Sequence, residues 1–181
     1  MSIKKTNIHN NVKFKTELFE LVKSILIAII VAIIIIAFIF QTVSVDGSSM
    51  YPTLRNNDRL IIEKVTYYFQ KPKSMDIIVM KNPRNNSERY IKRIIAVEGD
   101  KIEIYNNKVY INGSLKDEPY LFENRINDFG EITVPKNTVF VLGDNRNNST
   151  DSRILGPINL KLIVGKAFIR LLPFNKAGRI R

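Results

Sequence analysis

The order of hydrophobic and polar positions divides the chain into a continuous apolar block near its start and a long region of short apolar runs. Residues 25–40 carry no polar side chain. Extended back to Leu21, the block reaches about 20 residues, enough for a helix to cross a bilayer core. The pattern predicts a basic tail over residues 1–20, a transmembrane anchor over 21–41 and one further domain over 42–181.

Two other interpretations of the apolar block are available. A cleaved signal peptide has a similar polarity, but residues 42–44 (Thr-Val-Ser) make a poor small-x-small cleavage site. A buried core helix is disfavoured because the block is apolar on every side. The anchor is therefore the favoured interpretation.

After the block, short apolar runs between polar segments predict β-strands. They occupy residues 43–45, 60–62, 77–80, 90–97, 102–111, 132–142 and 162–172. Asn106-Asn107 and Pro135-Lys136-Asn137 predict turns that divide two of these runs. Helical periodicity outside the anchor is limited to residues 64–69. The expected fold class is one N-terminal transmembrane α-helix followed by a mostly-β extracytoplasmic domain.

Composition restricts the chemistry that this chain can perform. The 181 residues include one histidine, His9, and no cysteine. Without cysteine there is no disulfide, no thiol nucleophile and no cysteine-bound metal, and one histidine argues against a Ser-His-Asp triad or a multi-histidine metal site. A hydrolase of this composition needs a lysine or a carboxylate as its base, and we expect no metal or other cofactor.

The distribution of charge predicts orientation and partners. Five lysines precede or enter the apolar block, namely Lys4, Lys5, Lys13, Lys15 and Lys23. Such a basic tail stays in the cytoplasm, which predicts a single-pass plasma-membrane protein with its later domain outside. The net charge of +11 suits nucleic acid or an anionic membrane surface. Because basic residues are scattered among acids without an aromatic-rich basic stripe, we expect membrane lipids and no nucleic acid as partners.

A serine soon after the anchor is the first candidate for chemistry. Ser49 lies between Gly47 and Pro52. The glycine permits an unusual backbone angle, and the proline restricts its own φ. A rigid turn there would expose the hydroxyl and the backbone N–H of Ser49. A serine-rich turn without a chemical role explains the same residues.

A lysine within an apolar strand is the second candidate. By strand alternation, Lys92 shares one face with Tyr90, Ile94 and Ala96. Burial favours the neutral amine, so it lowers the pKa and would let Lys92 act as a general base near neutral pH. A strand-edge lysine with its amine in water is the alternative.

A wholly polar segment over residues 143–153 follows the apolar run 139–142. Four of its side chains are expected to form an ion-pair network among themselves that fixes the loop: Asp144, Arg146, Asp151 and Arg153. A solvated loop that satisfies its own turns is the alternative.

Together, these segments resemble the type I signal peptidases, the membrane-bound Ser/Lys proteases. The matching blocks are Gly-Ser-Ser-Met-Tyr-Pro-Thr-Leu at 47–54, Tyr-Ile-Lys-Arg at 90–93 and Gly-Asp-Asn-Arg-x-Asn-Ser-x-Asp-Ser-Arg at 143–153, with Gly-Asp at 99–100. The resemblance covers roughly residues 20–172, and the single anchor is similar to the Gram-positive form.

The resemblance implies a role for each site residue. Ser49 is the nucleophile that forms an acyl-enzyme, and Lys92 is the general base. Ser149 orients the lysine, while the Ser49 N–H and the Gly47 position form the oxyanion hole. Four further residues support the site: Asp144, Arg146, Asp151 and Arg153.

The resemblance also implies the substrate. Secretory preproteins with small residues at −1 and −3 would bind as an extended strand beside Val43 and Val45. Val45, Met50 and Tyr90 are the candidate substrate-binding residues.

Departures from the family pattern affect the loops. Residues 74–76 (Ser-Met-Asp) lack the usual glycine, Asn147 replaces a frequent aspartate, and Pro157 stands where an apolar residue is common. Two functional alternatives remain: a membrane-anchored, non-catalytic β binding module, and a self-cleaving protease with the same dyad. The latter usually carries a DNA-binding domain, and no such segment is visible here.

Overall fold

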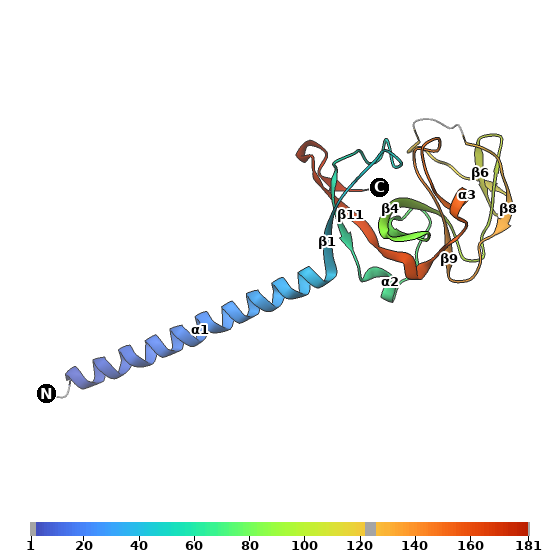
Figure 1. Cartoon of the computed structure of the whole chain (residues 1–181). Coiled ribbons are helices and arrows are strands. Elements are labelled where there is room, and N and C mark those ends of the chain that lie inside the picture. The colour runs from blue at the N-terminus through green and yellow to red at the C-terminus, as the bar shows by residue number, and fades with distance from the viewer. Residues whose placement is uncertain (1–2, 122–125, 181) are drawn as a thin grey trace. The chain divides into compact units, whose positions relative to one another are not determined.

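The computed structural model describes residues 3–121 and 126–180, with side chains from residue 17 onward in these ranges. The chain forms two compact units that divide between Ile39 and Phe40 (Figure 1). The first contains one helix and the second contains the sheets. Each is described by itself.

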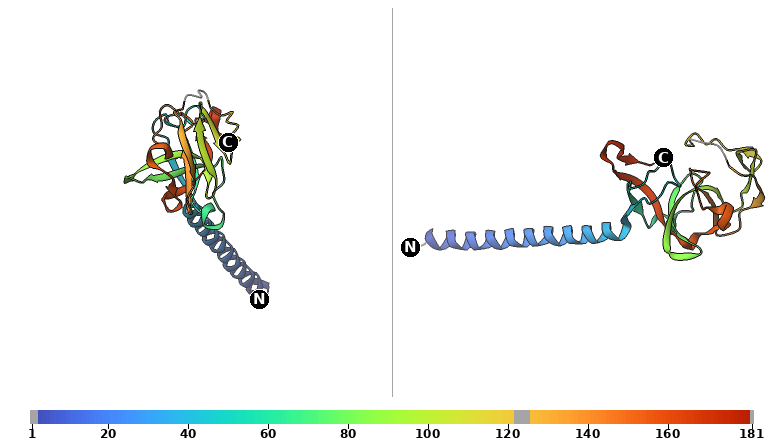
Figure 2. Two further views of the ribbon diagram at one scale, coloured as in Figure 1. Left: turned by 90° about the vertical axis from the view of Figure 1, so that its right-hand side faces the viewer. Right: turned by 45° about the horizontal axis from the view of Figure 1, so that its top comes forward.

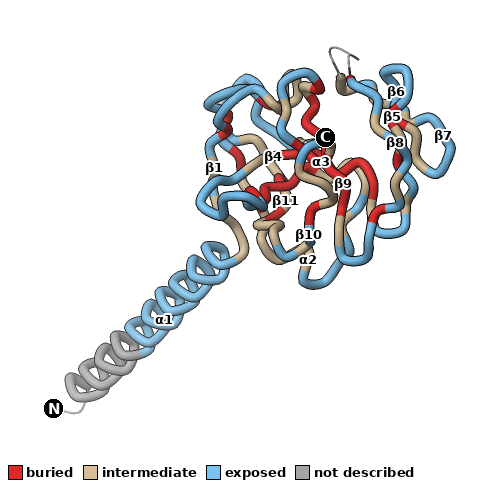
Figure 3. The backbone as a smooth tube through the Cα atoms, turned by 45° about the vertical axis from the view of Figure 1, so that its right-hand side comes forward, coloured by how far each residue is buried: buried red, intermediate tan, exposed pale blue. Residues whose placement is uncertain are grey.

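The first unit is helix α1 (Ile3–Ile39). Its segment Glu17–Ile39 is the one stretch among the described residues that is long and apolar enough to cross a membrane. The described side chains of this segment are exposed up to Phe38 (Figure 3). Phe40 and Gln41, which lie inside the expected anchor, are the first residues of a strand.

The second unit is mostly β-structure, which confirms the expected fold class. Its larger sheet is antiparallel, with the order β1 (Phe40–Ser44), β2 (Arg59–Glu63), β11 (Ile163–Leu172), β3 (Ile77–Asn82), β4 (Asn85–Val97), β9 (Thr138–Leu142) and β10 (Ile158–Asn159); β12 (Gly178–Arg179) also pairs with β11. Four short helices connect the strands: α2 (Thr66–Phe69), α3 (Ser152–Leu155), η1 (Leu160–Leu162) and η2 (Phe174–Lys176).

A smaller antiparallel sheet packs beside β4 and β9. Its order is β7 (Ser114–Leu115), β6 (Lys108–Ile111), β5 (Lys101–Tyr105) and β8 (Phe129–Thr133), and Figure 2 shows it from two further sides. Asn106 and Asn107 adopt φ values of 50° and 62°, as a tight turn between antiparallel strands requires, so the predicted hairpin is confirmed.

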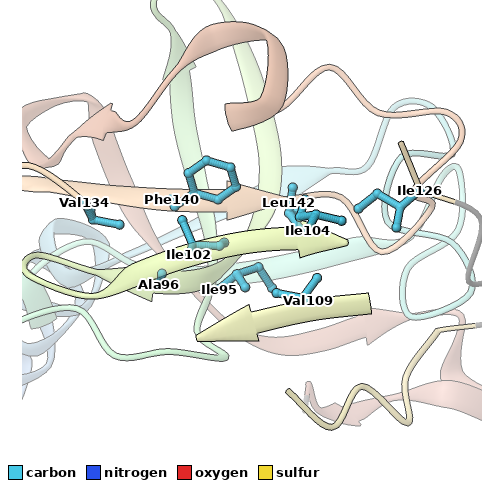
Figure 4. Close-up of a cluster of buried hydrophobic side chains, with 9 residues drawn as sticks. All are labelled: Ile95, Ala96, Ile102, Ile104, Val109, Ile126, Val134, Phe140 and Leu142. Atoms are coloured by element: carbon cyan, nitrogen blue, oxygen red, sulfur yellow. The ribbon is translucent and has the colours of Figure 1, made fainter. Parts of the chain in front are cut away.

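One cluster of buried hydrophobic residues lies where the two sheets meet, and two others contain residues of the larger sheet and none of the smaller one. In Figure 4, Ile102 and Ile104 of β5 lie against Phe140 and Leu142 of β9, and all four are buried. Strand β9 is buried along nearly its whole length, and β4 is buried in its second half, from Lys92 to Ala96 (Figure 3). The residues that β4 carries into the site are therefore held by a packed sheet.

Candidate active site

Ser49 lies in the turn that follows β1. The chain is fixed before it by the Val45 N–H, which donates to the Asp58 carbonyl at 2.8 Å, and after it by the Leu54 N–H, which donates to the Met50 carbonyl at 2.8 Å. The Ser49 carbonyl accepts from the Asn145 N–H at 2.9 Å. The serine is therefore held both by its own turn and by the loop after β9.

Lys92 reaches Ser49 from the middle of β4. Its Nζ donates to Ser49 Oγ at 2.8 Å, and the residue is 3% exposed. In the sheet register Lys92 lies opposite Ile78 of β3, which is fully buried. The Tyr90 ring centroid lies 5.2 Å from Nζ. The structure thus brings together the two residues that the sequence singled out.

The surroundings of Lys92 lower its pKa from the usual 10.5 to about 8. Burial is the largest cause, because it removes water from the charged amine, and Arg153 lowers the pKa further. The carboxylates of Asp151 and Asp144 act in the opposite direction. At pH 7 about one amine in ten is then neutral, compared with roughly one in 2,500 for a solvated lysine.

The expected face of β4 is only partly correct. Tyr90 and Ile94 pack in one apolar cluster with Ile78, but Ala96 packs with Ile95 in another cluster. The register between β4 and β9 shifts between Ile94 and Ala96, and such a bulge interrupts the alternation of side chains. The prediction for Ala96 was therefore wrong.

The polar loop 143–153 is ordered by ion pairs, but the expected network within the loop was largely wrong. Asp144 pairs with Arg93 of β4 at 2.7 Å, and Arg146 pairs with Glu118 at 2.6 Å. Only Asp151 and Arg153 pair with each other inside the loop, at 2.8 Å. The loop is therefore tied to segments far away in the sequence.

Several residues in this framework were missed from the sequence. Arg93 is fully buried and stacks over the Tyr120 ring, with 4.0 Å between the guanidinium carbon and the ring centroid. An arginine beside Lys92 in a buried strand was the available signal, because a buried charge needs a partner. Glu118 and Tyr120 carry no comparable signal, because the residues around them in the sequence do not indicate that they contact loop 143–153 or Arg93.

Ser149 and Gly143 lie together beside the Ser49 backbone. The Ser149 Oγ is buried and has no hydrogen-bond partner among the described residues. A Cβ added to Gly143 would come closer than 3.0 Å to the Ser149 side chain and to the Ser49 carbonyl oxygen. Gly143, which we did not single out as a site residue, thus allows the loop to approach the serine.

A cleft of about 320 Å³ runs between β1 and β4 to the Ser49–Lys92 pair. Its lining includes all three candidate substrate-binding residues, Val45, Met50 and Tyr90. The first two are almost fully buried, so they form the floor of the cleft. Strand β1 pairs with β2 on one side only and is the edge of its sheet.

Gly47 lines the same cleft in a left-handed conformation, with a φ of 90°. Its N–H donates to Asn56 Oδ1 at 2.9 Å. In the part of the chain that the structure describes, no group of three or more histidine or acidic side chains is arranged to hold a metal ion.

Comparison with known proteins places the chain in a family. The family model described as "Signal peptidase, peptidase S26" matches residues 18–172. The chain belongs to this family. Signal peptidase I S of Bacillus subtilis (strain 168) is 40% identical over 178 residues, which cover 92% of this chain and 95% of that protein. Membership supports removal of signal peptides by a serine protease and confirms the resemblance seen in the sequence.

A second relative agrees with this assignment, and one solved structure is also similar. Signal peptidase I of Bacillus licheniformis is 40% identical over 173 residues, 90% of this chain and 92% of that protein. A crystal structure of a signal peptidase I from Enterococcus faecalis V583 is 36% identical, covers 54% of this chain and 97% of that chain, and has a TM-score of 0.49. The apolar helix and this membership support a membrane-anchored protein.

Proposed function

We propose that the chain is a membrane-bound serine endopeptidase that cleaves signal peptides from secretory preproteins with a Ser49–Lys92 dyad. The observation that carries this proposal is the 2.8 Å contact between Lys92 Nζ and Ser49 Oγ in a site that lowers the lysine pKa. A serine hydroxyl needs a base within hydrogen-bond reach to become a nucleophile, and this contact provides one.

The reaction proceeds in two steps. Neutral Lys92 accepts the Ser49 proton while Oγ attacks the scissile carbonyl carbon. The tetrahedral intermediate collapses, the C–N bond breaks, and the lysine returns its proton to the leaving amine. A water molecule then attacks the acyl-enzyme, with Lys92 again accepting and returning the proton, and the cleaved signal peptide leaves with a new carboxylate.

Stabilisation of the intermediate requires donors beside the nucleophile. The Ser49 N–H supplies one, and the Gly47 position is the proposed second site. Because the Gly47 N–H donates to Asn56 Oδ1, it contributes only if that bond is exchanged for the oxyanion. Ser149 keeps its proposed role of orienting Lys92, since its buried hydroxyl is available for a partner.

Four charged side chains support the site by holding the loop. Asp144 and Arg146 tie it to Arg93 and Glu118, and Asp151 accepts from the Gly143 N–H at 3.1 Å and pairs with Arg153. These four residues support the site by fixing where Gly143 and Ser149 lie.

The cleft supports an extended peptide as substrate. The free edge of β1 can add a strand, and Val45 and Met50 supply an apolar lining for the small side chains expected at −1 and −3. We further propose a cytoplasmic tail over residues 1–20, an anchor over 21–41 and an extracytoplasmic catalytic domain over 42–181 that contacts membrane lipids and binds no nucleic acid.

The proposal is tested with the full chain purified in detergent and a preprotein substrate. Ser49→Ala, Lys92→Ala and Lys92→Arg should each abolish cleavage after the small residue, because arginine keeps its proton near neutral pH. Ser114→Ala and Lys101→Ala change exposed residues of the smaller sheet and should retain activity.

Substantial activity of Lys92→Arg would show that Lys92 is not the general base. Full biological function of Ser49→Ala would favour the non-catalytic binding module. Thermal melting of each variant separates loss of chemistry from loss of folding.

A further inference from the structure

The segment that leads into Ser49 is bonded to an asparagine side chain. The Gly47 N–H donates to Asn56 Oδ1 at 2.9 Å. Gly47 lies two residues before Ser49 and has a φ of 90°. Because glycine has no side chain to restrict its backbone, this conformation has to be maintained by contacts with other residues. The Asn56 side chain provides such a contact.

Asn56 reaches Gly47 because the pairing of β1 with β2 continues beyond both strands. The Val45 N–H donates to the Asp58 carbonyl at 2.8 Å, and the Asn57 N–H donates to the Val45 carbonyl at 2.9 Å. Asn56, one residue before Asn57, then comes beside the residues that follow Val45. The bond from Gly47 to the Asn56 side chain closes the end of this ladder.

The turn that presents Asn56 is fixed from its buried side. The Asp58 N–H donates to the Arg55 carbonyl at 3.1 Å, and the Arg55 N–H donates to Asp58 Oδ2 at 3.0 Å. Asp58 is 3% exposed and pairs with Arg170 of β11 at 3.2 Å. Asn57 has the positive φ, 68°, that a type II turn requires at its third residue. Asn56 is therefore exposed but belongs to a well-anchored turn.

The peptide groups between Gly47 and Ser49 are thus held from both ends. Asn56 bonds the N–H at the start of this segment, and the Asn145 N–H bonds the Ser49 carbonyl at its end, at 2.9 Å. An N–H that stabilises an oxyanion has to be aimed at it before the reaction, because reorienting it during the reaction costs free energy. The direction of the Ser49 N–H therefore depends on both bonds.

We propose that Asn56 is a positioning residue for the oxyanion hole. By accepting from the Gly47 N–H, its side chain fixes the segment that directs the Ser49 N–H at the scissile carbonyl oxygen. Asn56 is not among the residues that line the cleft, so it acts through Gly47 and does not touch the substrate. This inference rests on the proposed Ser49–Lys92 peptidase.

Steady-state cleavage by the full chain in detergent tests this role. Asn56→Ala removes the acceptor, and kcat should fall by about 10- to 100-fold. KM should change little, because a misdirected donor is missed mainly in the transition state. The midpoint of the pH profile should stay that of the wild-type chain, because the contact between Lys92 and Ser49 remains.

A second variant and a matched control isolate the hydrogen bond. Asn56→Asp keeps an oxygen acceptor of the same shape and should recover most of the lost kcat in high salt, which screens its added charge. Asn159 is also exposed, and its Oδ1 accepts from the Lys161 N–H at 3.0 Å, but it lies in β10, at the other end of the strand order from β1. Asn159→Ala should keep the wild-type kcat, and its melting temperature gives the effect of losing such a bond on folding.

Several results would overturn the inference. They are a wild-type kcat in Asn56→Ala, a loss confined to KM, equal losses in Asn56→Ala and Asn56→Asp, and a shifted pH midpoint, which would assign the effect to Lys92. A higher kcat in Asn56→Ala would also overturn it, because Asn56 would then compete with the oxyanion for the Gly47 N–H. If the wild-type chain cleaves and Ser49→Ala does not, each of these results leaves the proposed function intact.

Discussion

Lys92 shows how burial converts an ordinary residue into a candidate base. Its amine is surrounded by the sheet and by the Tyr90 ring, and it contacts the Ser49 hydroxyl directly. The nearby carboxylates of Asp151 and Asp144 prevent the pKa from falling further. The residue is therefore set to exchange protons close to neutral pH.

The pH dependence of cleavage should report this amine. Because neutral Lys92 is the active form, kcat/KM should rise with pH and level off above about 8. Below that value it should fall about tenfold per pH unit. Steady-state rates of the wild-type chain across pH 5–10 measure the midpoint, and a midpoint near 10.5, the value for a solvated lysine, would contradict the assignment.

Gly143 is a residue at which one added methyl should matter. In Gly143→Ala the new Cβ displaces the Ser149 side chain or the Ser49 carbonyl. We expect a loss of about 1–3 kcal/mol in the free energy of unfolding, and cleavage slower by about 100-fold if the serine moves by about 1 Å. Gly130→Ala, whose Cβ would meet no atom within 4 Å, is the matched control for both assays.

Met75 occupies the position where the family usually has glycine, and its backbone shows why. Its φ is 78°, a left-handed conformation that costs most side chains about 1–2 kcal/mol. Met75→Gly should raise the free energy of unfolding by about 1 kcal/mol once the greater freedom of unfolded glycine is subtracted. Gly99→Ala, at a φ of 87°, should lower the free energy of unfolding, because alanine is strained in this conformation. Denaturation midpoints measure both variants. Equal midpoints for the two would show that backbone strain is unimportant at these positions.

At the scale of elements, β4 is the strand that joins the site to the core. Lys92 faces the cluster of Ile78 and Ile94, while the next residue, Arg93, pairs with Asp144 in the loop after β9. Arg93 and Asp144 are both buried, so each charge depends on the other. One strand thus positions both the proposed base and the loop that carries Ser149.

Breaking this pair should destabilise the domain strongly. Arg93→Met or Asp144→Leu alone leaves an uncompensated buried charge, for which we expect a loss of about 3–5 kcal/mol in denaturant unfolding. The double variant should recover much of it. Lys101→Ala removes one partner of the exposed Lys101–Glu131 pair and should cost less than about 1 kcal/mol, so equal effects at both pairs would contradict this account.

At the scale of the whole molecule, the chain combines an apolar helix with a β domain that carries the site. The domain begins at Phe40, so β1 and the short segment 45–48 separate the helix from Ser49. The turn that carries Ser49 is therefore close in sequence to the apolar helix. A substrate whose own apolar segment lies in the bilayer would need a cleavage site only a few residues of chain away from that segment.

The proposed orientation can be tested because the chain has no cysteine. Tyr105→Cys places a thiol on an exposed turn-proximal position of β5, and Lys5→Cys places one in the basic tail. In intact cells a membrane-impermeant maleimide should label only the first, and both after lysis. Labelling of the tail alone in intact cells would show that the orientation is the reverse of the proposed one.

The sequence by itself determined the features that depend on local patterns. The length and apolarity of residues 25–40 predicted the helix, because a helix satisfies its backbone hydrogen bonds within itself and so suits a segment that is apolar on every side. Asn106-Asn107 predicted its turn because both residues tolerate positive φ. The motif around Ser49 and Lys92 identified the family, although their catalytic roles stay predictions.

Only the tertiary structure decided which distant residues meet. Arg93 and Asp144 are separated by 51 positions, and Arg146 and Glu118 by 28, so closure of the sheet and of its loops selects these partners. The bulge after Ile94, which moved Ala96 to another cluster, depends on the register with β9. The close approach of Gly143 to Ser49 is likewise set by packing between segments, which no local pattern of residues contains.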